Sequence, residues 1–333
     1  MVIRRRRFSG RGEAMRVDDV IDTAVDVGSV RLASPVMTAS GTAGYGTELG
    51  AYIDLSQLGA VVTKSIAHFE WPGNPSPRVA GVRGGMINAV GLQGPGVDRW
   101  IAEYLPPLLD TGAAVVCSIW GRSVDDYRLA ADALAKAPAG VIAVEVNLSC
   151  PNLEGRGSIF AHDAELSAAV VAATEGCARP RWAKLSPNTD RLIDVASAVM
   201  TSGAEAVTLV NTVLGMALDR TTLQPVLGNG GGGLSGPAIH PVAVRAIADV
   251  RAALPHIPII GAGGVESGWD AAELMAVGAS AVQVGSANFA DPRATARIQI
   301  ELVEEARRLG RGSLAALTNA MSTPFHDPRS TPR

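Results

Sequence analysis

Eight short apolar runs recur along the chain, each followed by polar or glycine-rich residues. They cover residues 34–39, 60–63, 114–119, 141–146, 182–185, 206–210, 257–260 and 281–284. Nearly continuous apolarity is typical of strands that are buried on both faces, as in parallel sheets. Amphipathic, Ala-rich stretches lie between the runs, at 124–136, 164–173, 191–200 and 269–277. Eight β–α repeats predict an α/β fold, a single (β/α)8 (TIM) barrel with long loops over its C-terminal face. A doubly wound sheet remains the alternative.

Length and composition agree with one large domain. The chain has 333 residues, of which 47% are hydrophobic and 18% charged, with a net charge of −3. This length lies within the range of one barrel with insertions. We expect a basic flexible tail at 1–20, the barrel at 21–310, and the end of a helix with a tail at 311–333. The weak net charge gives no reason to expect a nucleic acid or membrane partner.

The cysteines and the N-terminus indicate the cellular compartment. Cys117, Cys150 and Cys177 are too widely spaced to suggest a disulfide framework, a metal site or an iron–sulfur site. We expect Cys117 and Cys177 to be structural. Four arginines at 4–7 resemble a twin-arginine export signal, but no apolar segment follows them. No uninterrupted apolar run of about 18 residues occurs, so no membrane span is expected. These features predict a cytoplasmic protein.

The segment 147–152, Asn-Leu-Ser-Cys-Pro-Asn, is the most informative motif of the chain. It closes the fourth apolar run, so its polar groups emerge where a buried strand reaches the surface. Asn147 and Asn152 supply two carboxamides that can bind a planar, amide-bearing ligand, and Cys150 supplies a thiol that can move a proton. A cysteine in an apolar setting is usually structural, but packing alone does not explain an asparagine on each side of Cys-Pro.

The other strand ends also carry polar or glycine residues. They are Ala39-Ser40-Gly41, Lys64, Lys184, Asn211-Thr212, Gly263-Gly264 and Gly285-Ser286. In a (β/α)8 barrel the C-terminal strand ends surround one pocket. The glycine turns after the seventh and eighth strands lie where such barrels often bind phosphate through backbone amides. The sequence therefore predicts a phosphorylated ligand above a polar floor.

Three loops are long or glycine-rich enough to cover the pocket. The first, at 71–96, is rich in proline and glycine and is the longest excursion from the repeat pattern. Loops of this length are more often functional than idle. A second loop at 155–158 follows the cysteine motif and is a candidate lid. A third, at 228–237, is dense in glycine and is expected to be mobile when no anion is bound.

These residues resemble one known family, the class 1 dihydroorotate dehydrogenases, and specifically the class 1B (NAD-dependent) catalytic subunit. The resemblance spans roughly residues 30 to 290. It is carried by segments 35–42, 44–46, 73–78, 88–93, 147–152, 184–188, 211–216, 233–239, 263–264 and 282–285. The departures are Gly94 where asparagine is common, Ala43 where an aromatic is common, and the glycine run 230–233. We interpret this run as a feature that loosens the loop.

The resemblance implies oxidation of dihydroorotate to orotate in pyrimidine biosynthesis, with one FMN per chain. Cys150 would remove the C5 proton as general base, while hydride leaves C6 for flavin N5. Lys184 would stabilise the anion that grows at the flavin N1/O2 edge. Implied cofactor-binding residues are Ala39, Ser40, Gly41, Lys64, Ser65, Asn147, Lys184, Val210, Gly236, Gly263, Gly264, Gly285 and Ser286. Implied substrate-binding residues are Lys64, Asn88, Val90, Gly91, Leu92, Asn147, Asn152, Asn211 and Thr212.

The resemblance also implies partners. A class 1B catalytic subunit passes electrons to a separate subunit with FAD and a [2Fe–2S] cluster, and then to NAD⁺. We expect a homodimer core flanked by two such subunits. The alternatives are another FMN-dependent pyrimidine oxidoreductase, similar to tRNA-dihydrouridine synthase or dihydropyrimidine dehydrogenase, or a non-redox phosphate-binding lyase or isomerase. tRNA-dihydrouridine synthases usually carry a basic RNA-binding surface. This chain has a net charge of −3, and its arginine cluster lies at 4–7.

Overall fold

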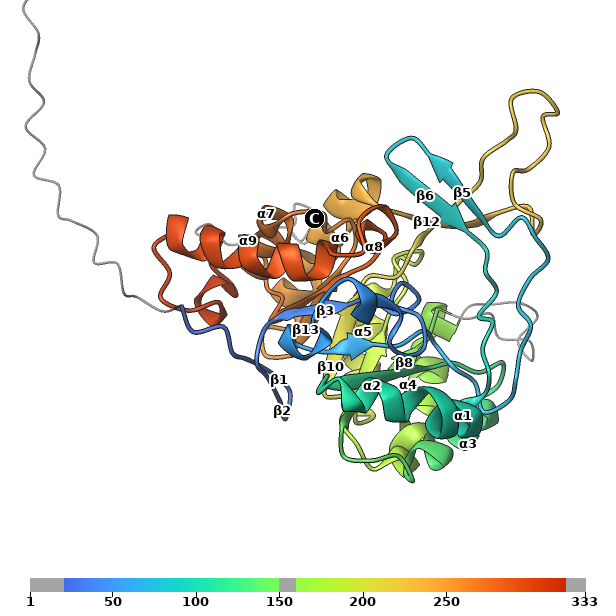
Figure 1. Cartoon of the computed structure of the whole chain (residues 1–333), viewed down its shortest axis with the longest axis horizontal. Helices are drawn as coiled ribbons and strands as arrows, with labels where there is room; N and C mark the ends of the chain where they lie inside the picture. Colours follow the sequence, from blue (N-terminus) through green and yellow to red (C-terminus); the bar gives the residue numbers. More distant parts are fainter. Residues whose placement is uncertain (1–20, 150–159, 322–333) are drawn as a thin grey trace, which may run out of the picture.

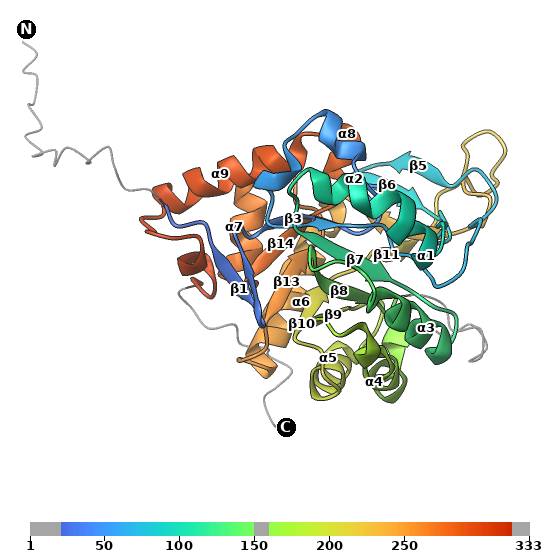
Figure 2. The same cartoon turned by 60° about the horizontal axis from the view of Figure 1, so that its bottom comes forward.

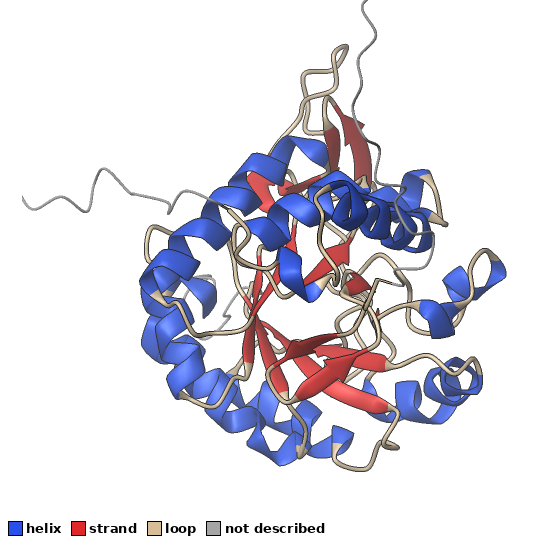
Figure 3. Cartoon of the chain, turned by 90° about the vertical axis from the view of Figure 1, so that its left-hand side faces the viewer, coloured by secondary structure: helices blue, strands red, loops and turns tan. Residues whose placement is uncertain are grey.

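The computed structural model describes residues 21–149 and 160–321, and the expected tail at 1–20 lies outside them. Eight parallel strands form one sheet in the order β3-β14-β13-β10-β9-β8-β7-β4. Their bounds are β3 (Val36–Thr38), β4 (Val61–Val62), β7 (Val115–Ile119), β8 (Val141–Asn147), β9 (Arg181–Lys184), β10 (Ala206–Leu209), β13 (Ile259–Ala262) and β14 (Ala281–Val284). Each lies at one of the eight predicted runs. The (β/α)8 barrel is confirmed (Figure 3).

The barrel closes between its two shortest strands, β3 and β4. Met37 and Ala60 form a parallel bridge there. The Thr38 hydroxyl donates to the Val62 carbonyl at 3.2 Å and accepts from the Val62 amide at 2.8 Å. A side chain thus replaces ladder hydrogen bonds that the short strands do not provide.

Helices surround the strand ring (Figure 2). Their bounds are α1 (Val97–Arg99), α2 (Leu105–Asp110), α3 (Val124–Leu134), α4 (Ala164–Ala173), α5 (Leu192–Thr201), α6 (His240–Ala253), α7 (Gly268–Ala276), α8 (Ala287–Ala290) and α9 (Ala294–Arg308). Side-chain caps fix three helix starts: Ser123 accepts from Asp126 N, Asp163 from Leu166 N, and Ser267 forms a capping box with Asp270. Such caps satisfy amides that have no partner within the helix. The four helices predicted from the sequence are confirmed within two residues at each end.

The barrel interior changes from apolar to polar along its axis. Its lower layer contains Met37, Val62, Val116, Ala143, Trp182, Ala206, Ile260 and Ala281, which pack as one cluster. Side chains two positions apart on a strand share a face. Two residues further along five of these strands stand Ser118, Glu145, Lys184, Thr208 and Gln283, all buried. We call these five residues the polar layer, and they lie directly beneath the strand ends.

A hairpin that the sequence did not predict covers the lower layer. β1 (Val25–Val27) pairs antiparallel with β2 (Val30–Leu32). In each of these three-residue strands the first and last residues are buried and the middle residue is exposed. The four buried residues pack against the lower layer. The hairpin therefore closes the end of the barrel opposite to the predicted pocket.

A second sheet rises over the C-terminal face (Figure 1). It contains β11 (Val213–Gly215), β12 (Gly232–Ser235), β6 (Gly85–Asn88) and β5 (Val79–Val82), all antiparallel and in that order. The excursion at 71–96 and the segment 228–237 are therefore partly strands, and their interpretation as loops was incomplete.

Two glycines of the run, Gly232 and Gly233, pack tightly within this second sheet. β-carbons added at Gly232 and Gly233 would collide with the Asn88 carbonyl and the Thr212 side chain, respectively. Gly81 in β5 has nothing within 4 Å of such an added carbon. The two glycines of β12 therefore permit close approach, which the sequence alone did not reveal.

Gly233→Ala is accordingly expected to lower the free energy of unfolding by about 1–3 kcal/mol, as for overpacked sites. Gly81→Ala, in the same sheet but in open space, is the control and should change it by about 0.5 kcal/mol or less. Chemical denaturation of both variants checks this. Equal midpoints for the two would show that β12 has room for a β-carbon.

Candidate active site

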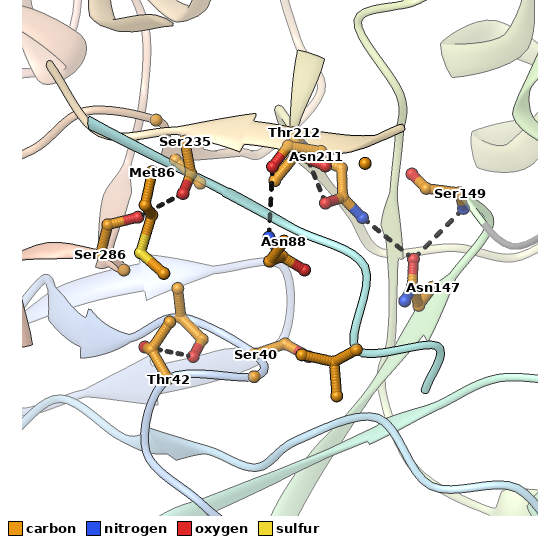
Figure 4. A pocket seen from close by; sticks show the side chains of 18 of the residues that line it. Ser40, Thr42, Met86, Asn88, Asn147, Ser149, Asn211, Thr212, Ser235 and Ser286 are labelled. Carbon is orange, nitrogen blue, oxygen red and sulfur yellow. Dashed lines mark hydrogen bonds between the residues drawn. The ribbon is translucent and has the colours of Figure 1, made fainter. Parts of the chain in front are cut away.

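A pocket of about 410 Å³ opens at the C-terminal strand ends, between the barrel and the second sheet. Every candidate residue that the structure describes lines it: Ala39, Ser40, Gly41, Lys64, Ser65, Asn88, Val90, Gly91, Leu92, Asn147, Lys184, Val210, Asn211, Thr212, Gly236, Gly263, Gly264, Gly285 and Ser286. Figure 4 shows several of them turned toward one another. Cys150 and Asn152 lie outside the described residues.

Two asparagines from neighbouring strand ends form one linked group. Asn211 Nδ2 donates to Asn147 Oδ1 at 3.2 Å (Figure 4). Asn147 Nδ2 donates to Ser65 Oγ at 3.1 Å. The Ser149 amide also donates to Asn147 Oδ1, at 3.2 Å. The Tyr127 hydroxyl donates a hydrogen bond to the backbone carbonyl of Asn147 at 2.6 Å. Asn147 is therefore fixed in orientation before any ligand binds.

The end of β6 in the second sheet and the segment after β9 place further carboxamides at the pocket. Asn88 Nδ2 donates to the Gly233 carbonyl at 3.3 Å, so the end of β6 is tied to β12. Asn188 bridges the Thr212 carbonyl, at 3.0 Å, and the Leu214 amide, at 2.9 Å. Asn88 and Asn188 both line the pocket. Carboxamides approach it from below and from above, so a flat ring with N–H and C=O groups can be matched on both edges.

Glu145 is the centre of the polar layer beneath the pocket, although it is not among the site residues predicted from the sequence. Its carboxylate is fully buried and accepts from Gln283 Nε2 at 2.6 Å and from Thr208 Oγ1 at 3.2 Å. Lys184 Nζ lies 3.6 Å from Glu145 Oε1 and donates to Gln283 Oε1 at 3.2 Å. This buried charge pair holds the Lys184 ammonium at the pocket floor.

A chain of hydroxyls joins Glu145 to the asparagine group. Ser118 Oγ donates to Glu145 Oε1 at 3.5 Å and lies 2.9 Å from Ser65 Oγ. Ser40 Oγ contacts both serines, at 3.0 and 3.2 Å. The polar layer thus supports both the Lys184 side and the Asn147 side of the pocket.

Lys64, just after β4, also lines the pocket. Its ammonium lies 5.4 Å from the centre of the Tyr45 ring, and its side chain is partly buried. Burial lowers the pKa of Lys64 below the usual lysine range, and the nearby positive charge of Arg78 lowers it further. An anionic group of a ligand would relieve both effects, which makes Lys64 suited to bind a carboxylate.

Backbone groups and hydroxyls form the end of the pocket beside β12, β13 and β14. Gly236, Gly263, Gly264 and Gly285 line it together with Ser235 and Ser286, whose hydroxyls are 2.6 Å apart. Gly41, with φ of +89°, has nothing within 4 Å of an added β-carbon, so the floor is open there. A backbone that a ligand can approach closely and the hydroxyls of short side chains are suited to bind a phosphate. The open floor, together with Lys184, is suited to bind a flat ring. These residues therefore fit FMN.

Several lining residues were missed. They include Thr42, Asn74, Val79, Met86, Ser149, Ser186, Asn188, Leu214, Asn229, Ser235, Gln283 and Phe289. Ser186 and Asn188 belong to a strand-end segment that had been noted, so that segment held the signal. Gln283 and Asn229 also lie in segments singled out above, 282–285 and 228–237, but neither was predicted as a site residue. Phe289 lies outside every such segment, so no sequence signal marked it.

The described cysteines lie in the interior, away from the pocket. Cys117 and Cys177 are both buried. Burial raises the pKa of Cys117 to about 12 and also raises that of Cys177. Neither lines the pocket, which agrees with the structural role expected for both.

Residues 21–149 and 160–321 contain neither a candidate membrane span nor a candidate metal site. No helix there has the length and apolarity needed to cross a membrane. In the same residues, no group of His, Cys, Asp and Glu side chains is arranged to hold a metal ion.

Comparison with known proteins assigns the family. The sequence pattern of the Dihydroorotate dehydrogenase family matches residues 23–305. The chain is 45% identical over 276 residues to "Dihydroorotate dehydrogenase B (NAD(+)), catalytic subunit" of Alkaliphilus metalliredigens, covering 83% of this chain and 90% of that one. It is 42% identical over 301 residues to the protein of the same name from Geotalea daltonii, covering 90% and 98%. The chain therefore belongs to the dihydroorotate dehydrogenase family.

Proposed function

We propose that the chain is the catalytic subunit of a class 1B dihydroorotate dehydrogenase, which oxidises dihydroorotate to orotate in pyrimidine biosynthesis. The observation that carries this is the pocket itself. It combines a linked carboxamide group, a buried Lys184 and a glycine-lined end, and its lining includes Ser149, which precedes Cys150 in the sequence. FMN, when bound, accepts the hydride that leaves C6 of the substrate.

The chain's own residues bind and orient the reactants. Asn88, Asn147, Asn211 and Thr212, with Asn152, bind the edges of the pyrimidine ring, and Lys64 binds its carboxylate. Val90, Gly91 and Leu92 form the wall beside it. Cys150 takes the C5 proton as general base. Lys184, held by Glu145 and Gln283, stabilises negative charge at the floor.

FMN content tests this function directly. The purified full chain is expected to be yellow and to release FMN on denaturation, with about one flavin per chain. Dihydroorotate added without oxygen should bleach the flavin band. A colourless protein that cannot be reconstituted with FMN would rule out the proposed function.

We also propose a partner subunit that carries FAD and a [2Fe–2S] cluster, around a homodimer of this chain. The phrase "catalytic subunit" in the relatives' names supports a second subunit. An apolar rim lies beside the pocket, formed by Val79, Leu214 and Phe289, which are 50%, 63% and 59% exposed. Electrons from the pocket would cross this rim, so we propose that the partner subunit binds there. The three dispersed cysteines favour the cytoplasm.

The electron acceptor gives a further prediction. The isolated chain is expected to reduce a dye with dihydroorotate but to reduce NAD⁺ very slowly, because it has neither a nicotinamide-binding domain nor cluster-ligating cysteines. Parallel assays with NAD⁺, fumarate and a dye check this. Fast turnover with fumarate would place the chain in class 1A. Fast reduction of NAD⁺ by the chain alone would contradict the need for a partner.

A further inference from the structure

His240 occupies the junction behind the glycine-lined end of the pocket. It is the first residue of α6 and follows the turn Pro237–Ile239. Its side chain is 11% exposed and faces the turn after β13 and helix α7. It does not itself line the pocket. Its contacts nevertheless reach residues that do.

Both ring nitrogens of His240 have an oxygen partner. Nδ1 donates to the Gly263 carbonyl at 2.9 Å. Nε2 lies 3.1 Å from Glu273 Oε2 and 3.9 Å from Asp270 Oδ1. A carbonyl and a carboxylate only accept, so the ring satisfies both hydrogen bonds only as imidazolium, with a proton on each nitrogen. Hydrogen bonds from a charged donor are stronger than neutral ones.

The bond to Gly263 fixes one peptide plane. In a trans peptide the carbonyl and the following N–H point in opposite directions. Because the Gly263 carbonyl points at His240, the Gly264 N–H points away from it. Gly263 and Gly264 both have positive φ, of 132° and 67°, a region in which glycine has wide freedom. Without a partner for that carbonyl, this peptide could rotate.

Packing adds a second constraint on the same turn. A β-carbon at Gly264 would lie 2.7 Å from His240 Cβ and 2.9 Å from the Gly236 carbonyl. Gly236 also lines the pocket. His240 therefore joins the turn after β13 to the turn before α6, and α7 supports the ring from behind through Glu273.

We infer that His240 is a positioning residue for the phosphate group of the flavin, which acts by fixing the Gly263–Gly264 peptide with its N–H available to the anion. This inference rests on the proposed function, since it takes FMN as the ligand. A purely structural role of His240 would affect the whole pocket, whereas the positioning role affects only the end that binds the phosphate. The polar partners of His240 are Gly263, Asp270 and Glu273, whereas Lys184 at the ring end of the pocket is held by Glu145 and Gln283.

Riboflavin, which is FMN without its phosphate, provides the test. Dissociation constants of both flavins are measured by fluorescence quenching with full-length protein stripped of flavin. His240→Phe keeps a ring but removes both hydrogen bonds. It is expected to weaken FMN binding about tenfold or more, the effect of losing a hydrogen bond from a charged donor, and to change riboflavin binding less than about twofold. His240→Asn keeps a donor near the Nδ1 position and should recover part of the loss. The exposed His256, replaced by Asn, is the control and should change neither constant.

Equal weakening of FMN and riboflavin, or unchanged FMN binding, would overturn the inference. If His240→Phe does not fold, Glu273→Gln decides, because it leaves the ring in place and removes its charged partner. It should weaken FMN about threefold, with riboflavin unchanged, and no loss for FMN would again overturn the inference. A wild-type protein that binds neither flavin would instead contradict the proposed function. Failure of the two proposals is therefore distinguishable.

Discussion

Cys150→Ala is expected to keep its FMN but to reduce it with dihydroorotate about 10²–10⁴-fold more slowly than the wild type, the usual contribution of a positioned base. The carboxamides and Lys184 remain in this variant, so substrate should still bind. Flavin reduction is followed by stopped-flow absorbance without oxygen, which isolates the half-reaction in which C5 loses its proton and C6 its hydride.

The pH profile separates a base from a packing role. An ordinary thiol is only a few per cent thiolate at neutral pH, so the wild-type rate should rise with pH as Cys150 ionises and then level off. Cys150→Ser should keep some activity, displaced to higher pH, whereas Cys150→Ala should lose this dependence. Cys117→Ala is the matched control, since Cys117 is buried away from the pocket. Flavin reduction at the wild-type rate in Cys150→Ala would show that another group takes the proton.

Glu145→Ala should cause the largest loss of stability. It removes the carboxylate of a buried pair and leaves the Lys184 ammonium, 6% exposed, without its counter-charge. Breaking one side of such a pair typically costs about 3–5 kcal/mol. The loss also frees Gln283, Thr208 and Ser118, which all contact the same carboxylate. We therefore expect weaker FMN retention as well as easier unfolding.

An exposed pair provides the control. Glu103 pairs with Arg99 at 2.8 Å on the surface, where both side chains are about half exposed. Glu103→Ala should change the free energy of unfolding by about 0.5 kcal/mol or less. Urea midpoints of both variants are compared at one protein concentration. If Glu145→Ala unfolded at the same midpoint as Glu103→Ala, the polar layer would have no role in stability.

The barrel could be predicted because its signal is local. Each apolar run is long enough to mark a buried strand, and the runs repeat at spacings that leave room for a helix. The hairpin of β1 and β2 was missed because each of its strands has three residues, too few to show alternation. The β5–β6 hairpin of the second sheet is local, but its other pairings are distant, as between Asn88 and Gly233. This sheet was missed because of those distant pairings and because glycine in a strand reads as a loop.

The site was predictable for a different reason. Parallel strands bring their C-terminal ends together, so polar residues such as Lys64 and Lys184 could be assigned to one pocket without coordinates. Glu145 and Gln283 could not be assigned in this way, since a single polar residue inside an apolar run gives no sign of its partner. His240 lies at a helix start and carried no signal, because its role depends on Gly263 and Glu273, which are remote in sequence.

The polar layer also has a consequence for how the strands align during folding. Parallel apolar strands can slide past one another with little loss of hydrophobic contact, so apolar packing alone discriminates poorly between neighbouring alignments. A slip of β8 by one residue would turn Glu145 toward the helices. Lys184 and Gln283 would then be buried without that partner, at a cost of several kcal/mol. The charges under the pocket thus penalise misaligned barrels, and the same side chains that serve the ligand select the one strand alignment in which the pocket exists.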